Sequence, residues 1–228
     1  MGNSNIFRLA FCRVSSIMVL HIPLGIVCGI LFKEAGFAWY VAPLYSLFVF
    51  AAAMQFVTLS MLMSGSSLLL IALTLIPIGV RNIIYGLTMI KRFEKAPPFL
   101  RGYMAFGLID GIYSILQIGE QPEGKEDVRF ITYLCLLAHI TWVLGTLLGS
   151  FVDLFLPIPP KLEFSLTAFF AAAAFEMVRK QKQRRTLLIA FTSLTLALLI
   201  IPKYFFLGGI LLSAAAALII PPKKKVLQ

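Results

Sequence analysis

Two oppositely charged side chains lie within apolar stretches of the chain. Arg81 follows the apolar run at 75–80, and Asp110 lies between two glycines in residues 106–111. A charge near the centre of a membrane helix costs about 2.5–3.5 kcal/mol on insertion scales, so such residues usually face a partner or a cavity. Two interpretations follow, and they are compatible. The two side chains pair with each other, or they anchor a zwitterionic substrate or a coupling proton.

Several neighbours of these charges are candidates for the same site. Pro77 and Gly79 predict a kink or break before Arg81, because proline removes a backbone donor and disturbs the preceding turn. Asn82 follows Arg81 directly and is a candidate pathway residue. Gln55 follows three alanines. Its amide either orients polar atoms of a substrate or forms a hydrogen bond between helices.

Neither histidine nor cysteine forms a catalytic or metal-binding pattern. His21 and His139 each stand alone in apolar sequence, which favours a structural role over a ligand or proton relay. Cys12, Cys28 and Cys135 form no C-x-x-C pair and are expected to be small apolar residues. The chain lacks H-E-x-x-H, G-x-S-x-G and P-loop motifs. We therefore expect no enzyme activity, no metal and no cofactor.

The composition is that of a membrane protein. The 228 residues are 60% hydrophobic and only 13% charged, with a mean hydropathy of +0.92, whereas soluble domains are about 25% charged. The net charge of +10 comes from short basic clusters between apolar runs. Such clusters set membrane topology, so nucleic-acid binding is not expected. The sequence predicts an all-α, polytopic helical membrane protein, with residues 1–228 forming a single integral membrane domain.

Eight apolar segments are separated by turn or charge signals. They cover roughly residues 14–32, 37–63, 65–90, 99–119, 130–156, 162–178, 186–201 and 203–220. If all eight crossed the membrane with the N-terminus inside, the basic loop at 91–101 would lie outside and the acidic loop at 120–129 inside. This contradicts the positive-inside rule.

Six crossings and two incomplete segments remove the conflict. If 37–63 and 162–178 are re-entrant or broken helices, every basic cluster lies inside and the acidic loop lies outside. The basic clusters concerned are residues 91–101, 179–185 and 223–225. Both chain termini are then predicted to be cytoplasmic.

A weak internal repeat accompanies this arrangement. At an offset of 120 residues, Gly25 and Gly29 match Gly145 and Gly149, and an F-A-A-A stretch starting at Phe50 matches another starting at Phe170. Halves 1–119 and 120–228 would each hold three crossings, and an odd number predicts an inverted repeat, as in many secondary transporters. The glycines otherwise indicate ordinary close helix packing.

Three stretches resemble the AzlC-type large subunits of branched-chain amino acid exporters, the LIV-E family. They are residues 50–56, similar to F-A-G-A-x-Q-F; 79–86, similar to N-A-R-H-x-x-Y-G; and 106–111, similar to F-G-L-T-D-E. Gln55, Arg81 and Asp110 match, whereas Ala52, Gly79, Asn82, Ile109 and Gly111 depart from these patterns, so the chain resembles a divergent member.

The resemblance implies a function, a partner and a location. It implies a secondary transporter subunit that exports branched-chain or related amino acids across the bacterial inner membrane, driven by an ion gradient. It also implies a small hydrophobic AzlD-type membrane subunit as partner. Two other functions remain open: a membrane enzyme or lipid-handling protein that uses Asp110 as acid or base, and a structural or assembly subunit.

Overall fold

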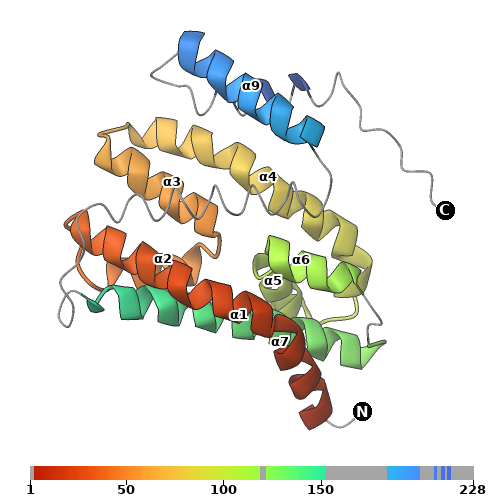
Figure 1. Ribbon diagram of the computed structural model, residues 1–228. Helices are drawn as coiled ribbons and strands as arrows, with labels where there is room; N and C mark the ends of the chain where they lie inside the picture. Colours follow the sequence, from red (N-terminus) through yellow and green to blue (C-terminus); the bar gives the residue numbers. More distant parts are fainter. Residues whose placement is uncertain are drawn as a thin grey trace.

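The computed structural model describes residues 3–118, 122–152 and 184–200, together with positions 208, 209, 212, 213, 215 and 216. Within these residues the fold is entirely helical (Figure 1). The helices are α1 (Asn3–Glu34), α2 (Val41–Phe48), α3 (Ala52–Met63), α4 (Leu68–Phe93), α5 (Pro98–Phe106), α6 (Asp110–Gln117), α7 (Lys125–Gly149) and α9 (Arg184–Ile200).

Three of the described helices, α1, α4 and α7, are long and apolar enough to cross a membrane. The bent pair α5–α6 makes a fourth crossing only if its two helices count as one span. At 1.5 Å per residue, a crossing of the roughly 30 Å hydrocarbon layer takes about 20 residues. The all-helical membrane class predicted from the sequence is confirmed. Of the six predicted crossings, those at 14–32, 65–90 and 130–156 correspond to the three long described helices.

Helices α1 and α7 are in direct backbone contact. Gly25 and Gly29 of α1 lie against Gly145 and Gly149 of α7, and we call these four residues the glycine seam. A Cβ atom built on Gly149 would lie only 2.1 Å from the carbonyl oxygen of Ile26. Small residues let membrane helices approach this closely, where dispersion contacts between backbones stabilise the pair.

The two helices of the glycine seam run in the same direction (Figure 1). Phe7 packs edge-on against Tyr133 with ring centroids 5.4 Å apart, and further along both helices the seam residues meet in the same order. An inverted repeat of halves 1–119 and 120–228 requires these matched helices to be antiparallel. The predicted inversion is therefore wrong for this pair, because in the described structure only α4 crosses between them.

Residues 37–63 form two helices, as the prediction of a broken segment requires. Helix α2 ends at Phe48, and Ala51 has an extended backbone (φ −151°, ψ 99°) before α3 begins. The two helices are antiparallel, since the Tyr45 and Thr58 hydroxyls lie 3.0 Å apart and Leu62 and Phe37 line one cavity. The pair thus enters and leaves at the same end of the molecule.

Residues 99–119 were expected to form one crossing, and this prediction is wrong. Helices α5 and α6 meet at an angle of 107° across residues 107–109. The bend brings Gly107 against α7, where an added Cβ would lie 2.6 Å from the Cβ of Cys135. A continuous apolar run carries no signal for such a bend, because the close packing on Cys135 is a tertiary contact.

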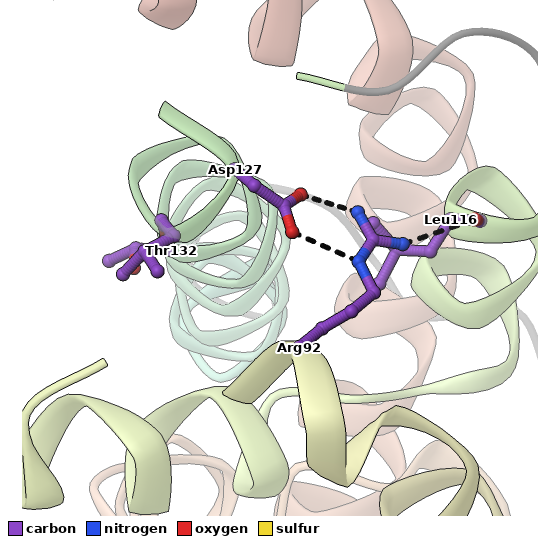
Figure 2. A network of polar contacts seen from close by, with 5 residues as sticks. Arg92, Leu116, Asp127 and Thr132 are labelled. Atoms are coloured by element: carbon purple, nitrogen blue, oxygen red, sulfur yellow. Dashed lines mark hydrogen bonds and ion pairs between the residues drawn. The ribbon is translucent and has the colours of Figure 1, made fainter. Parts of the chain in front are cut away.

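A largely buried ion pair joins the end of α4 to the start of α7, beside the last turn of α6 (Figure 2). The guanidinium of Arg92, at the end of α4, donates two hydrogen bonds to the carboxylate of Asp127 near the start of α7, one of them from Nε at 3.0 Å. Its Nη1 also donates to the carbonyl of Leu116 in the last turn of α6, at 3.4 Å. The ends of α4 and α6 and the start of α7 therefore meet.

This contact overturns the predicted topology of the two charged loops. Residues 91–101 and 120–129 were placed on opposite sides of the membrane, yet Arg92 and Asp127 are in contact. The positive-inside rule counts lysine and arginine, whereas acidic residues contribute little to orientation. The acidic stretch was therefore an unsuitable marker for the outer side.

The two broken pairs enter from opposite ends of the molecule. Near one end, Arg13 Nη1 donates to the carbonyl of Ile118 at 3.3 Å, and we call this the Arg92 end. At the other, the rings of Trp39 and Phe151 lie 5.1 Å apart, and we call this the Trp39 end. Helices α2–α3 enter from the Trp39 end and α5–α6 from the Arg92 end.

Two further sequence predictions concern single segments. Helix α4 is continuous through Pro77 and Gly79, so the break expected before Arg81 is absent. Membrane helices tolerate proline, and unwound backbone facing lipid would leave further polar groups unsatisfied. The second predicted re-entrant segment, 162–178, lies outside the described residues, as do most of segment 203–220 and the basic cluster at 223–225.

Candidate functional site

Arg81 and Asp110 form an ion pair halfway along the molecule. Arg81 lies near the middle of α4, and its Nη1 is 2.9 Å from Oδ2 of Asp110. The sequence placed Asp110 mid-way along a continuous crossing. In the structure it is the first residue of α6, directly after the 107° bend. A carboxylate is favoured there by the positive end of the helix dipole.

Tyr85, one turn after Arg81, completes this site. Its hydroxyl donates to Oδ1 of Asp110 at 2.9 Å, so each carboxylate oxygen has a partner. The ring of Tyr85 stacks on that of Tyr113 with centroids 4.2 Å apart and an interplanar angle of 13°. The stack holds the Tyr85 hydroxyl in position. Sequence reasoning missed Tyr85, although its spacing of four residues from Arg81 places both on one helix face.

The site remains accessible in the described structure. The side chains of Arg81 and Asp110 are 45% and 49% exposed, and only 11% of the most apolar stretch of α4 is buried. The surrounding surface is apolar, with Val80, Ile83 and Ile84 exposed beside the charges. An accessible cation and anion in an apolar surround can bind the carboxylate and ammonium of a zwitterion.

Gln55 lies in a separate, buried network. Its Nε2 donates to the carbonyl of Val49 at 2.6 Å, which satisfies a backbone acceptor left over where α2 is interrupted. Its Oε1 accepts from Trp142 Nε1 at 3.3 Å and also from the side chains of Cys28 and Ser46. The amide oxygen is fully occupied by protein donors, and the structure does not bring this side chain to Arg81 and Asp110.

The other predicted pathway residues of α4 have simpler surroundings. Asn82 is half-buried and has no side-chain hydrogen bond to a residue that the structure describes. Gly79 faces α3, because an added Cβ would lie 2.9 Å from Cε of Met54. Pro77 is half-buried within the same helix.

The two histidines have specific partners. His139 Nε2 donates to the carbonyl of Ser46 at 3.2 Å, so its Nδ1 is free to accept from the Tyr103 hydroxyl at 3.3 Å. His21 Nδ1 donates to the carbonyl of Ala138 at 3.2 Å. Both histidines therefore bond to protein groups, in line with the structural role expected from the sequence. Sequence reasoning missed that His139 contacts both broken helix pairs, because those contacts depend on the fold.

The described residues contain no group of three or more histidine, cysteine, aspartate or glutamate side chains arranged to hold a metal ion. Within the same residues, the cysteines at 12, 28 and 135 are free thiols. The site therefore consists of one ion pair and one tyrosine.

Sequence comparison assigns the chain to a known family. The model of the AzlC protein family matches residues 16–156, which include both broken pairs, the ion pair and the glycine seam. The chain belongs to the AzlC family. The family resemblance noted from residues 50–56, 79–86 and 106–111 is thus confirmed.

Similar AzlC-family relatives occur in distant organisms. The chain is 30% identical over 175 residues to an uncharacterized membrane protein of Helicobacter pylori, covering 76% of each chain. It is 26% identical over 178 residues to the branched-chain amino acid transport protein AzlC of Bacillus subtilis, covering 78% of this chain and 70% of that one. It is 29% identical over 140 residues to the inner membrane protein YgaZ of Escherichia coli, covering 59% and 56%.

No solved structure shows significant similarity to the chain. The Helicobacter pylori and Escherichia coli relatives are named as membrane proteins, and the name of the Bacillus subtilis relative describes transport. A membrane protein of the AzlC family, with apolar spanning helices and a transport-type relative, is the identity that these observations support.

Proposed function

We propose that the chain is the large subunit of a secondary transporter that exports branched-chain or related amino acids across the bacterial inner membrane. The observation that carries the proposal is the Arg81–Asp110 ion pair, which lies at mid-depth between the centre of α4 and the start of α6 and is half exposed. The name of the Bacillus subtilis relative supplies the substrate class.

The ion pair suits the common part of every amino acid. Arg81 would bind the α-carboxylate, and Asp110 would bind the ammonium group or exchange a coupling proton. Binding replaces one ion pair with two, so both protein charges stay neutralised at a depth where an unpaired charge is costly. Exposed apolar side chains around the pair, such as Val80 and Ile84, suit a branched aliphatic group.

The partner and orientation extend the proposal. A small hydrophobic AzlD-type subunit would cover the exposed face of α4 and shield the ion pair from lipid. The N-terminus would be cytoplasmic, since Arg8 and Arg13 precede the first apolar run and Lys91 and Arg92 lie near the same end.

The direct test measures efflux of isotope-labelled leucine and valine from cells that express the chain with and without its partner. Arg81→Ala and Asp110→Asn should abolish the efflux at normal protein level. Unchanged efflux of every amino acid tested would contradict the proposal.

A charge exchange separates the transport function from a structural subunit, which the mutually satisfied ion pair also allows. The double variant Arg81→Asp with Asp110→Arg keeps an ion pair but reverses the charges presented to a substrate. We expect normal protein level and no efflux. Efflux restored by the exchange would mean that the pair only stabilises the subunit.

A further inference from the structure

The two broken helix pairs meet at a cluster of rings around His139. Phe50, in the break between α2 and α3, lies 6.3 Å from Phe106 at the end of α5, measured between ring centroids. The ring of His139 lies 4.8 Å from Phe50 and 5.3 Å from Phe106. The breaks that enter from the Trp39 end and from the Arg92 end are therefore in contact near the middle of α7.

His139 also forms a hydrogen bond to each broken pair. Nε2 donates to the carbonyl of Ser46 on α2, and Nδ1 accepts from the hydroxyl of Tyr103 on α5. His139, only 8% exposed, thus links α2 and α5 to the seam helix α7.

Polar groups gather around this cluster although it lies at membrane depth. The described interior contains Ser46, Gln55 and His139, which are all buried. Interrupted backbone at this depth is tolerated where it is buried in protein or lines a pathway, and half-helices from opposite sides enclose the binding region in many transporters. Apolar constrictions close pathways by excluding water. The Phe50–Phe106 contact has the position and character of such a constriction.

We propose that Phe50 and Phe106 form the closed gate of the transport path, and that His139 holds this gate shut by its bonds to Ser46 and Tyr103. The proposal rests on the proposed transport function for what passes through. When the rings part, the Ser46 carbonyl and the Tyr103 hydroxyl become available to polar groups in transit. His139 is a positioning residue, because it acts through the two helix pairs.

Two native cysteines report on this gate. Cys28 donates to Gln55 beside the first break, and Cys135 packs against Gly107 in the second. Both thiols are buried, whereas Cys12 is exposed. A Cys12→Ser background therefore leaves two reporters, one at each break, whose reaction with N-ethylmaleimide in native membranes measures gate opening without any transport assay.

The variants at position 139 separate the two bonds. His139→Leu removes both, and should raise the labelling rate of Cys28 and Cys135 at least about fivefold, because each lost bond is worth at least about 0.5 kcal/mol. His139→Gln keeps a donor for Ser46 and should stay within about twofold of the parent. Thr141→Val, which removes only an intrahelical bond to Leu137 on the same helix, is the matched control.

Further comparisons separate opening of the gate from unfolding of the protein and from loss of transport. Tyr103→Phe removes a single bond to His139 and should raise labelling at least about twofold, which keeps the test decisive if His139→Leu does not accumulate. Equal labelling of parent, His139→Leu and Tyr103→Phe would overturn the gate, as would an equal increase in Thr141→Val. Faster labelling in a chain that exports no amino acid would support the gate and reject the proposed substrate.

Discussion

The Cα atom of Gly149 lies so close to Ile26 that a methyl group at position 149 would sit 2.1 Å from the Ile26 carbonyl oxygen. Gly149→Ala must therefore push α1 and α7 apart. We expect a loss of about 1–3 kcal/mol in stability, the range for overpacking a close contact. Thermal loss of the monodisperse peak in detergent measures it. Gly86→Ala on α4, where nothing lies within 4 Å, should leave the transition unchanged.

The contact between Arg92 and Asp127 predicts a strong coupling. Asp127 is only 5% exposed and Arg92 is 25% exposed. Replacing either by alanine leaves the other charge without its partner, so each should cost about 2–3 kcal/mol, slightly below the range for fully buried pairs. The apolar double variant Arg92→Met with Asp127→Leu should lose less than either single variant. Additive losses in urea unfolding would contradict a direct pair.

The Arg92 end and the Trp39 end should be accessible from opposite sides of the membrane, which thiol labelling can test. Single cysteines at Glu94 and Glu123, which are exposed on either side of α5–α6, should react with an impermeant thiol reagent from the same side of the membrane. A cysteine at Glu34, the last residue of α1 at the opposite end, should react only from the other side. If 99–119 were one simple crossing, Glu94 and Glu123 would label from opposite sides. The parent for these variants carries Cys12→Ser, so that the exposed native thiol does not react, and this parent without an added cysteine is the control.

The sequence predicted the elements that depend on local composition. The apolar runs gave the three long helices, the positive-inside rule gave the broken pair α2–α3, and isolated charges gave the Arg81–Asp110 pair. The apolar runs and the isolated charges are visible residue by residue, because placing polar or charged groups among apolar residues is costly.

The features that were missed depend on contacts between distant segments. The bend at Gly107 depends on Cys135, and the position of Asp127 depends on Arg92. The offset of 120 residues matched the four glycines that meet in the glycine seam, but a sequence match does not give the relative direction of two helices. Counting one crossing too many in 99–119 reversed the expected direction of α7.

The amide of Gln55 is expected to stabilise the break between α2 and α3. Gln55→Leu leaves the Val49 carbonyl and the Trp142 indole N–H without their partner, and each unsatisfied buried group costs about 1–3 kcal/mol. Stability should therefore fall by about 2–6 kcal/mol in thermal or urea unfolding. Gln117→Leu, at an exposed position at the end of α6, is the matched control and should be neutral within about 0.5 kcal/mol.

The Tyr85 hydroxyl makes a prediction within the proposed site. Tyr85→Phe keeps the stack on Tyr113 but removes the bond to Asp110, worth about 1 kcal/mol. If Tyr85 holds Asp110 in position for the substrate, KM for efflux should rise roughly fivefold at normal protein level. Thr88→Val, which leaves Asp110 untouched, should have little effect. Equal KM values in both variants would place Tyr85 outside the site.

The bond between His139 and Ser46 joins residues 93 positions apart in the chain. During synthesis, helix α2 therefore emerges long before the donor that satisfies its last turn. The broken pair α2–α3 can settle at membrane depth only after α7 has been inserted and has docked on α1. Nascent chains arrested before residue 125 should consequently hold α2–α3 near the membrane surface, and insertion of α7 is the step that completes the first third of the protein.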